Sequence, residues 1–185
     1  GEYNVAFGYG ALTTEDAGNR NTAIGYKSLE NLNVNGDALN TAVGYASGQQ
    51  MTTGLQNTIL GGHAADALTT GSYNIAIGAY ALTTEDTGSR SLAIGYSALQ
   101  NQNYNGEAFN VAIGHLSGQN VTTGVKNTLI GGLAGDALTT GEKNVAIGYN
   151  ALSSEDTGDR SVAIGHDALA SQNYDGDAYN VAIGY

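Results

Sequence analysis

Neighbouring carboxylates stand in a segment that occurs three times in the chain. Glu15 and Asp16 come shortly before Arg20, and the same order returns at 85–90 and 155–160. Paired carboxylates can serve as general acid and base, but a glycosidase needs its two groups on opposite sides of the scissile bond. Side-by-side acids on a solvated, repeated turn instead predict an ion pair with Arg20, worth under about 1 kcal/mol. We therefore expect no catalytic residue and no enzymatic activity.

Oxygen-bearing side chains alternate around a glycine in three other segments, NVNGD at 33–37, NYNGE at 103–107 and NYDGD at 173–177. Alternating carboxylate and amide oxygens can wrap a calcium ion, but Asn-Gly and Asp-Gly are also the strongest signals for tight turns. We expect turns, with calcium as the weaker alternative and no other cofactor. The calcium ligands would be Asn33, Asn35 and Asp37; Asn103, Asn105 and Glu107; and Asn173, Asp175 and Asp177.

The composition argues against several classes of function. The 185 residues include 28 Gly, no Pro and no Cys, and the formal net charge is −11. An acidic chain without a basic stripe is repelled by phosphate backbones, so we expect no nucleic-acid partner. No apolar run approaches the roughly 18 residues of a membrane-crossing helix, so we expect no membrane span.

A five-residue phrase, NVAIG in its commonest form, recurs along the whole chain. Its copies begin at residues 4, 21, 40, 57, 74, 91, 110, 127, 144, 161 and 180, with spacings of 17 or 19 residues. Four spacings sum to 70, and ALTTEDAGNR at 11–20 returns as ALTTEDTGSR at 81–90. Repeats of this size are typical of stacked, quasi-one-dimensional proteins. We expect one repetitive segment over 1-185, with super-repeats 1-70, 71-140 and a truncated 141-185.

Side chains alternate within the phrase as they do in a β-strand. We therefore predict an all-β fold, a parallel β-solenoid of about eleven coils, with the first-position Asn residues stacked as an amide ladder. The fourth position is always large and apolar, and we expect it to fill the interior. Its residues are Phe7, Ile24, Val43, Leu60, Ile77, Ile94, Ile113, Ile130, Ile147, Ile164 and Ile183.

The opposite face of the phrase carries mostly small residues, Asn, Ala and Gly. Glycine is favoured where two backbones approach closely, so we expect identical chains to pack on this face; the alternative is a tight bend within one coil. The predicted packing residues are Ala6, Gly8, Ala23, Gly25, Ala42, Gly44, Ala76 and Gly78.

Aromatic or histidine residues follow many of the phrases, as at Tyr9, Tyr26 and His115. An exposed aromatic column could stack on sugar rings, but we favour a role in covering strand ends at a corner. The histidines lack the HxH or HExxH spacing of metal ligands.

Three segments, NTAIGYKSL at 21–29, NVAIGYNAL at 144–152 and SVAIGHDAL at 161–169, resemble the head repeats of trimeric autotransporter adhesins, as also found in phage tail-fibre proteins. The resemblance covers essentially the whole chain. It implies a left-handed β-roll, a homotrimer and no catalytic residues. The coils of 17 and 19 residues exceed the commoner adhesin-head repeat, which predicts extended loops on one side.

These observations predict a shaft or head segment of an extracellular fibre that attaches to a host or surface, on a virion or a bacterial cell. Its partners would be copies of itself and a host-surface glycan or protein. The alternatives are a subunit of a self-assembling extracellular filament and, less favoured, a carbohydrate-binding or depolymerising tailspike.

Overall fold

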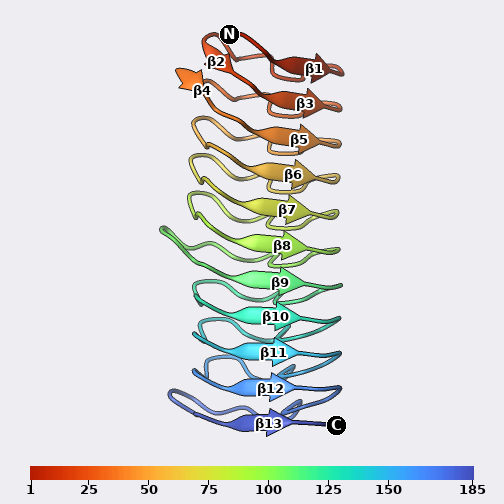
Figure 1. Ribbon diagram of the computed structural model, residues 1–185, viewed down its shortest axis with the longest axis vertical. Coiled ribbons are helices and arrows are strands. Elements are labelled where there is room, and N and C mark those ends of the chain that lie inside the picture. Colours follow the sequence, from red (N-terminus) through yellow and green to blue (C-terminus); the bar gives the residue numbers. More distant parts are fainter.

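The protein is a rod of stacked coils in a computed structural model that describes residues 1–185 (Figure 1). Eleven three-residue strands form one sheet along the rod, and no helix that could span a membrane is present. The strands are β1 (Val5–Phe7), β3 (Thr22–Ile24), β5 (Thr41–Val43), β6 (Thr58–Leu60), β7 (Ile75–Ile77), β8 (Leu92–Ile94), β9 (Val111–Ile113), β10 (Thr128–Ile130), β11 (Val145–Ile147), β12 (Val162–Ile164) and β13 (Val181–Ile183).

Each strand pairs in parallel with the next strand of the sheet, and the register keeps the repeat positions aligned. Val5 pairs with Thr22, for example, and Phe7 pairs with Ile24. A separate two-stranded sheet joins β2 (Gly18–Asn19) to β4 (Gly36–Asp37) at a corner of the first coils. The predicted parallel β-solenoid of about eleven coils is therefore confirmed.

The glycine at the fifth position ends each strand because the next coil leaves no room for a side chain. The φ angle of Gly25 is +132°, and a Cβ on this residue would lie 2.2 Å from the carbonyl oxygen of Gly44. Gly78 has the same geometry, with 2.4 Å to the oxygen of Gly95. The close backbone approach predicted for these glycines exists, but it joins successive coils of one chain.

The interior is lined by the small third-position residues. Ala23, Ala42 and Ala76 are fully buried, whereas Ala6 is exposed only because it lies in a terminal rung. Leucines from the turns, such as Leu29 and Leu99, fill the remaining space and are also fully buried. The prediction that the small face packs against other chains is therefore wrong for the buried Ala23, Ala42 and Ala76. Packing of another chain on Ala6 and on the partly exposed Gly8, Gly25, Gly44 and Gly78 stays a prediction.

The fourth-position side chains point outward, so the predicted interior residues are also wrong. None of them is buried, and Phe7 and Ile183 in the terminal rungs are the most exposed, at 75% each. The predicted alternation is present but has the opposite phase, and a shift of one residue exchanges the two faces of a strand. The residues concerned are Phe7, Ile24, Val43, Leu60, Ile77, Ile94, Ile113, Ile130, Ile147, Ile164 and Ile183.

Two rungs show how tightly the interior is filled. At β6 and β10 the inward alanine is replaced by Ile59 and Leu129, and both are fully buried. Glycines stand opposite these larger side chains: a Cβ on Gly48 would lie 3.0 Å from Ile59 Cδ1, and one on Gly118 would lie 2.6 Å from Leu129 Cδ1. The small glycine in the turn leaves room for the larger side chain on the strand, so the interior stays closely packed.

Candidate functional site: an outward aliphatic face

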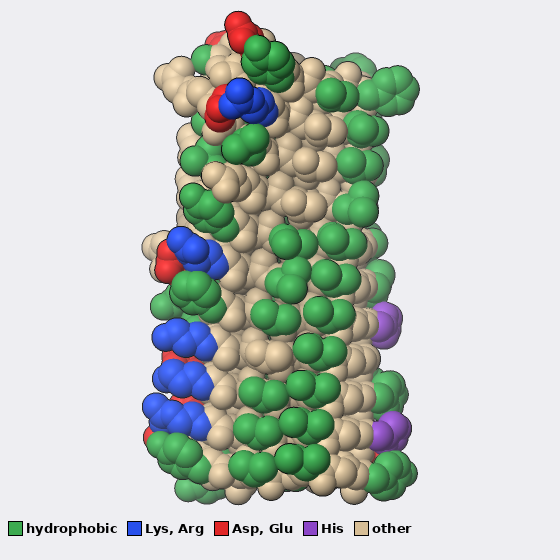
Figure 2. All heavy atoms as spheres, in the orientation of Figure 1, with side chains coloured by type: hydrophobic (Ala, Val, Ile, Leu, Met, Phe, Trp, Pro, Cys, Tyr) green, Lys and Arg blue, Asp and Glu red, His purple; other side chains and the backbone are tan.

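The outward face of the long sheet is the most continuous surface feature of the rod. Fourth-position residues form one of its columns, and second-position residues form the other. Figure 2 shows two columns of hydrophobic side chains over the lower half of this face. The second column is interrupted by Thr and consists of Val5, Thr22, Thr41, Thr58, Ile75, Leu92, Val111, Thr128, Val145, Val162 and Val181.

A column rich in cations borders this face on the side where the chain enters the strands, at the residue before each marker Asn or Ser. Blue side chains line this border in Figure 2. The position before the marker holds five of the six basic residues of the chain: Arg20, Arg90, Lys126, Lys143 and Arg160. A chain without a basic stripe was expected, but residues far apart in the sequence come together in this column. Lys126 has no acidic partner, whereas Lys143 pairs with Glu142 at 3.2 Å.

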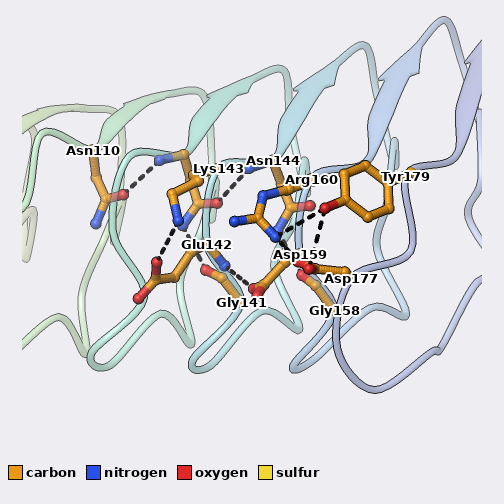
Figure 3. Close-up of polar contacts among 11 residues, drawn as sticks. Asn110, Gly141, Glu142, Lys143, Asn144, Gly158, Asp159, Arg160, Asp177 and Tyr179 are labelled. Carbon is orange, nitrogen blue, oxygen red and sulfur yellow. Dashed lines mark hydrogen bonds and ion pairs between the residues drawn. The ribbon is translucent and has the colours of Figure 1, made fainter.

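The arginines of this column pair with acids in the following coil. Arg160 bonds to Asp177, whose negative charge raises the pKa of the guanidinium, and it lies 5.5 Å from the centre of the Tyr179 ring (Figure 3). Arg20 likewise pairs with Asp37. The predicted pairing of Arg20 with Glu15 and Asp16 is therefore wrong, because the corner of the next coil brings a carboxylate closer.

These ion pairs also engage the calcium candidates. Asp37, Glu107 and Asp177, the carboxylates at the last position of the three candidate sets, each accept a bond from an arginine. No three acidic or histidine side chains gather around one point. Calcium binding at Asn33, Asn103 and Asn173 and their neighbours stays a prediction.

An aromatic ladder borders the other side of the aliphatic face. Consecutive rings stack from coil to coil, with centroids 5.0 Å apart between Tyr26 and Tyr45 and 5.6 Å apart between His63 and Tyr80. His63 and Tyr80 stand two residues after their glycines, one position later than the rings of the other coils, so they lie outside the predicted pattern. Because most neighbouring rings stack on one another, few ring faces remain for a sugar, which supports the corner-covering role.

The ladder is broken at one coil, where Gly132 and Leu133 provide no ring. In the equivalent coil one super-repeat earlier, His63 Nδ1 lies 2.8 Å from Asp66 Oδ2. Leu133 takes the place of that histidine, and the matching Asp136 has a buried oxygen without a hydrogen-bond partner. Burial raises the pKa of the Asp136 carboxyl.

The marker asparagines form a ladder through the backbone. Asn110 Oδ1 accepts a bond from the N–H of Asn127 at 2.9 Å, and Asn127 Oδ1 accepts one from the N–H of Asn144 (Figure 3). The side-chain N–H of Asn144 then donates to Gly158 O at 2.7 Å. The predicted ladder is therefore built mainly of amide–backbone bonds, which satisfy buried groups in each coil.

Serine replaces this asparagine at Ser91, and a buried polar cluster fills the vacated space. Gln102 Nε2 donates to Ser91 Oγ and to Glu85 Oε2, each at 2.8 Å, and Gln102 Oε1 accepts from Asn110. Glu85 also accepts from the backbone N–H of Gly88 at 2.7 Å. The glutamate predicted on a solvated turn is thus fully buried.

Burial raises the pKa of the Glu85 carboxyl, while the hydrogen bond from Gln102 is the strongest influence in the opposite direction. The first super-repeat lacks this arrangement, because Asn21 and Leu32 occupy the places of Ser91 and Gln102. These two positions change together: Asn21 occurs with Leu32, and Ser91 occurs with Gln102. This paired change is the sequence signal that could have revealed the cluster.

Comparison with protein-family models, with curated proteins and with solved structures finds no match for this chain. Its class follows from its fold: it is an all-β repeat protein, a parallel β-solenoid of about eleven coils. An extended aliphatic face lies between a cation-rich column and an aromatic ladder, and this surface is the candidate for interaction.

Proposed function

We propose that the chain is a structural segment of an extracellular fibre, a homotrimer that holds an attachment surface away from its anchor. The observation that carries this proposal is the aliphatic face, whose fourth-position column is apolar in all eleven rungs, although Thr interrupts the second column in four of them. Leu60 on this face is 46% exposed and Ile75 is 39% exposed in the single chain. Exposed apolar side chains that extend along the rod in this way mark an interaction site.

The occupant that fits this face best is another copy of the chain. Strands in the sheet repeat about every 4.8 Å, so a partner must have the same period to match the face from one end to the other. A parallel copy in register has that period and the same two aliphatic columns. The number three rests on the resemblance to trimeric adhesin heads, and such a bundle would bury the face along a common axis.

The mechanism would be mechanical. Eleven rungs at about 4.8 Å give a rod on the order of 50 Å long, and each further coil lengthens it by one rung. Three such rods joined by their aliphatic faces would form a stiff spacer. A glycan or protein on the host surface is the proposed final partner.

The test is the native mass of the protein together with a charge introduced on the face. The wild type is expected at three times its chain mass of 18.8 kDa. Ile147→Glu, on the outward side of β11, should release monomers that keep the β-sheet circular dichroism spectrum. Thr123→Glu, at an exposed turn away from the face, is the matched control and should stay trimeric.

A monomeric wild type, or a trimer that survives Ile147→Glu, would overturn the proposed interface. A series of polymers of increasing length would support the filament instead.

A further inference from the structure

The wider coils carry two Asn-Gly pairs at their outer corners, and these are the only Asn-Gly pairs in the chain. They are Asn35-Gly36 and Asn105-Gly106, while the third corner has Asp175-Gly176. Asn35, Asn105 and Asp175 are all exposed. Their corners project from one side of the rod in Figure 1.

We propose that Asn35 is a site of spontaneous deamidation. The backbone nitrogen of Gly36 attacks Cγ of Asn35, a C–N bond forms, and ammonia leaves with the side-chain nitrogen. Water then opens the cyclic imide at either carbonyl and leaves aspartate or isoaspartate. The only co-reactant is water, and glycine is the residue that hinders the attacking nitrogen least because it has no Cβ.

The first corner leaves these reacting groups free. A Cβ placed on Gly36 would meet nothing within 4 Å, and the φ angle of this glycine is +96°. The side-chain amide of Asn35 makes no hydrogen bond to another side chain or to the backbone. The backbone N–H of Gly36 does not bond to Val34 O. The nucleophile and the carbonyl carbon can therefore approach each other by local rotation.

The second corner restrains the equivalent groups of Asn105 and Gly106. The Gly106 N–H donates to Tyr104 O at 2.9 Å, and the Tyr104 ring lies 3.1 Å from the position of a Gly106 Cβ. Thr87 Oγ1 donates to Asn105 Oδ1 at 3.3 Å, whereas Ala17 holds the equivalent place in the first cycle. Breaking such contacts before the attack should slow Asn105 by roughly fivefold or more.

The third corner indicates what the product would look like. Asp175 Oδ1 accepts a bond from Thr157 Oγ1 at 2.6 Å, so the corner accommodates a carboxylate. Isoaspartate is different, because it adds a carbon to the backbone directly before β4. The pairing of β4 with β2 should loosen, while the long sheet of eleven strands stays intact.

The test follows both asparagines over time at mildly alkaline pH in the folded, full-length protein. Peptide mapping by mass spectrometry measures aspartate and isoaspartate, with synthetic peptides of 31–39 and 101–109 as unfolded references. Asn35 should convert at nearly the rate of its peptide, and Asn105 at roughly one fifth of its peptide's rate or less. Ala17→Thr should slow the reaction at Asn35, and Asn35→Gln should abolish it.

An Asn35 that stays intact while its peptide converts would refute the proposal, as would equal protection of both asparagines. Ala17→Thr without any slowing at Asn35 would also count against it. None of these outcomes depends on the native mass, so the result is separate from the test of the fibre.

Discussion

Replacing Gln102 by leucine tests whether the buried cluster around Glu85 supports its super-repeat. The substitution copies Leu32 of the first cycle into a coil that has serine at position 91. It removes a bond to a carboxylate, worth about 1.5–3 kcal/mol, and two neutral bonds of about 0.5–1.5 kcal/mol each. Added apolar burial offsets part of this loss, so we expect the free energy of unfolding to fall by about 2–4 kcal/mol.

Combining Gln102→Leu with Ser91→Asn should recover part of this loss. Both places then match the first cycle, where Asn21 accepts a bond from the Asn40 N–H at 3.1 Å. Ser91→Asn alone should cost about 1–3 kcal/mol, because the larger side chain meets Gln102 in a filled interior. We expect a coupling energy of about 1–2 kcal/mol between the two sites.

The pH dependence gives a second measurement on the same variants. Burial raises the pKa of Glu85 above its ordinary 4.5, and Gln102 opposes that rise. The folded state of Gln102→Leu should therefore hold the proton to a higher pH than the wild type does. Because the folded state binds more protons than the unfolded state in this window, stability falls as pH increases above about 4.5. The loss of stability of Gln102→Leu relative to the wild type should therefore be larger at pH 7 than at pH 4.5.

Urea unfolding followed by circular dichroism measures these differences, and hydrogen exchange at the Gly88 amide locates them. Gln172→Leu in the third cycle is the matched control. Gln172 is only partly buried, so its replacement should lower the free energy of unfolding by a smaller amount. A Gln102→Leu variant as stable as the wild type would refute the reasoning. Strict additivity of the two substitutions would refute the coupling.

Three further predictions concern the packing and the charges of other coils. Gly118→Ala should lower the free energy of unfolding in urea by about 1–3 kcal/mol, since the φ of +58° is strained for alanine and the new Cβ would meet Leu129. The double variant with Leu129→Ala should lose less stability than the sum of the two single variants. Leu133→His should pair with Asp136 and raise the melting temperature below about pH 6.5, with the gain lost at higher pH as the imidazole deprotonates. Asp136→Asn should increase stability at pH 7 but not near pH 3.8, because the raised pKa of Asp136 penalises the folded state only when the carboxyl ionises; equal effects at both pH values would contradict this.

The strands and their stacking were predictable because Asn, Gly and the alternation recur at fixed spacing. Side-chain size alone could not predict which face of each strand points to the interior. A large residue such as Ile24 was assigned to the interior, but leucines from the turns, such as Leu29, already occupy that space. Only alanine fits on the strand opposite them. Ile59 and Leu129 carried the missing signal, because each large residue at the third position coincides with a glycine in the facing turn.

The polar contacts were harder to foresee because their partners lie in different coils. Glu15 and Arg20 are close in sequence, yet Arg20 pairs with Asp37 in the next coil. Glu85 meets Gln102, which lies 17 residues away. In a solenoid, sequence distance equal to one coil means spatial contact, and an interpretation limited to local segments misses these pairs.

The two extra residues of the longer coils leave the long sheet undisturbed. Val162 pairs with Val181 across the longer coil at 173–177, in the same register that links the shorter coils. These corners therefore accept added length without moving the strands, and a peptide inserted there would be carried on a preformed scaffold. Four coils separate successive corners, so three grafted epitopes would be displayed in a row at intervals of about 19 Å.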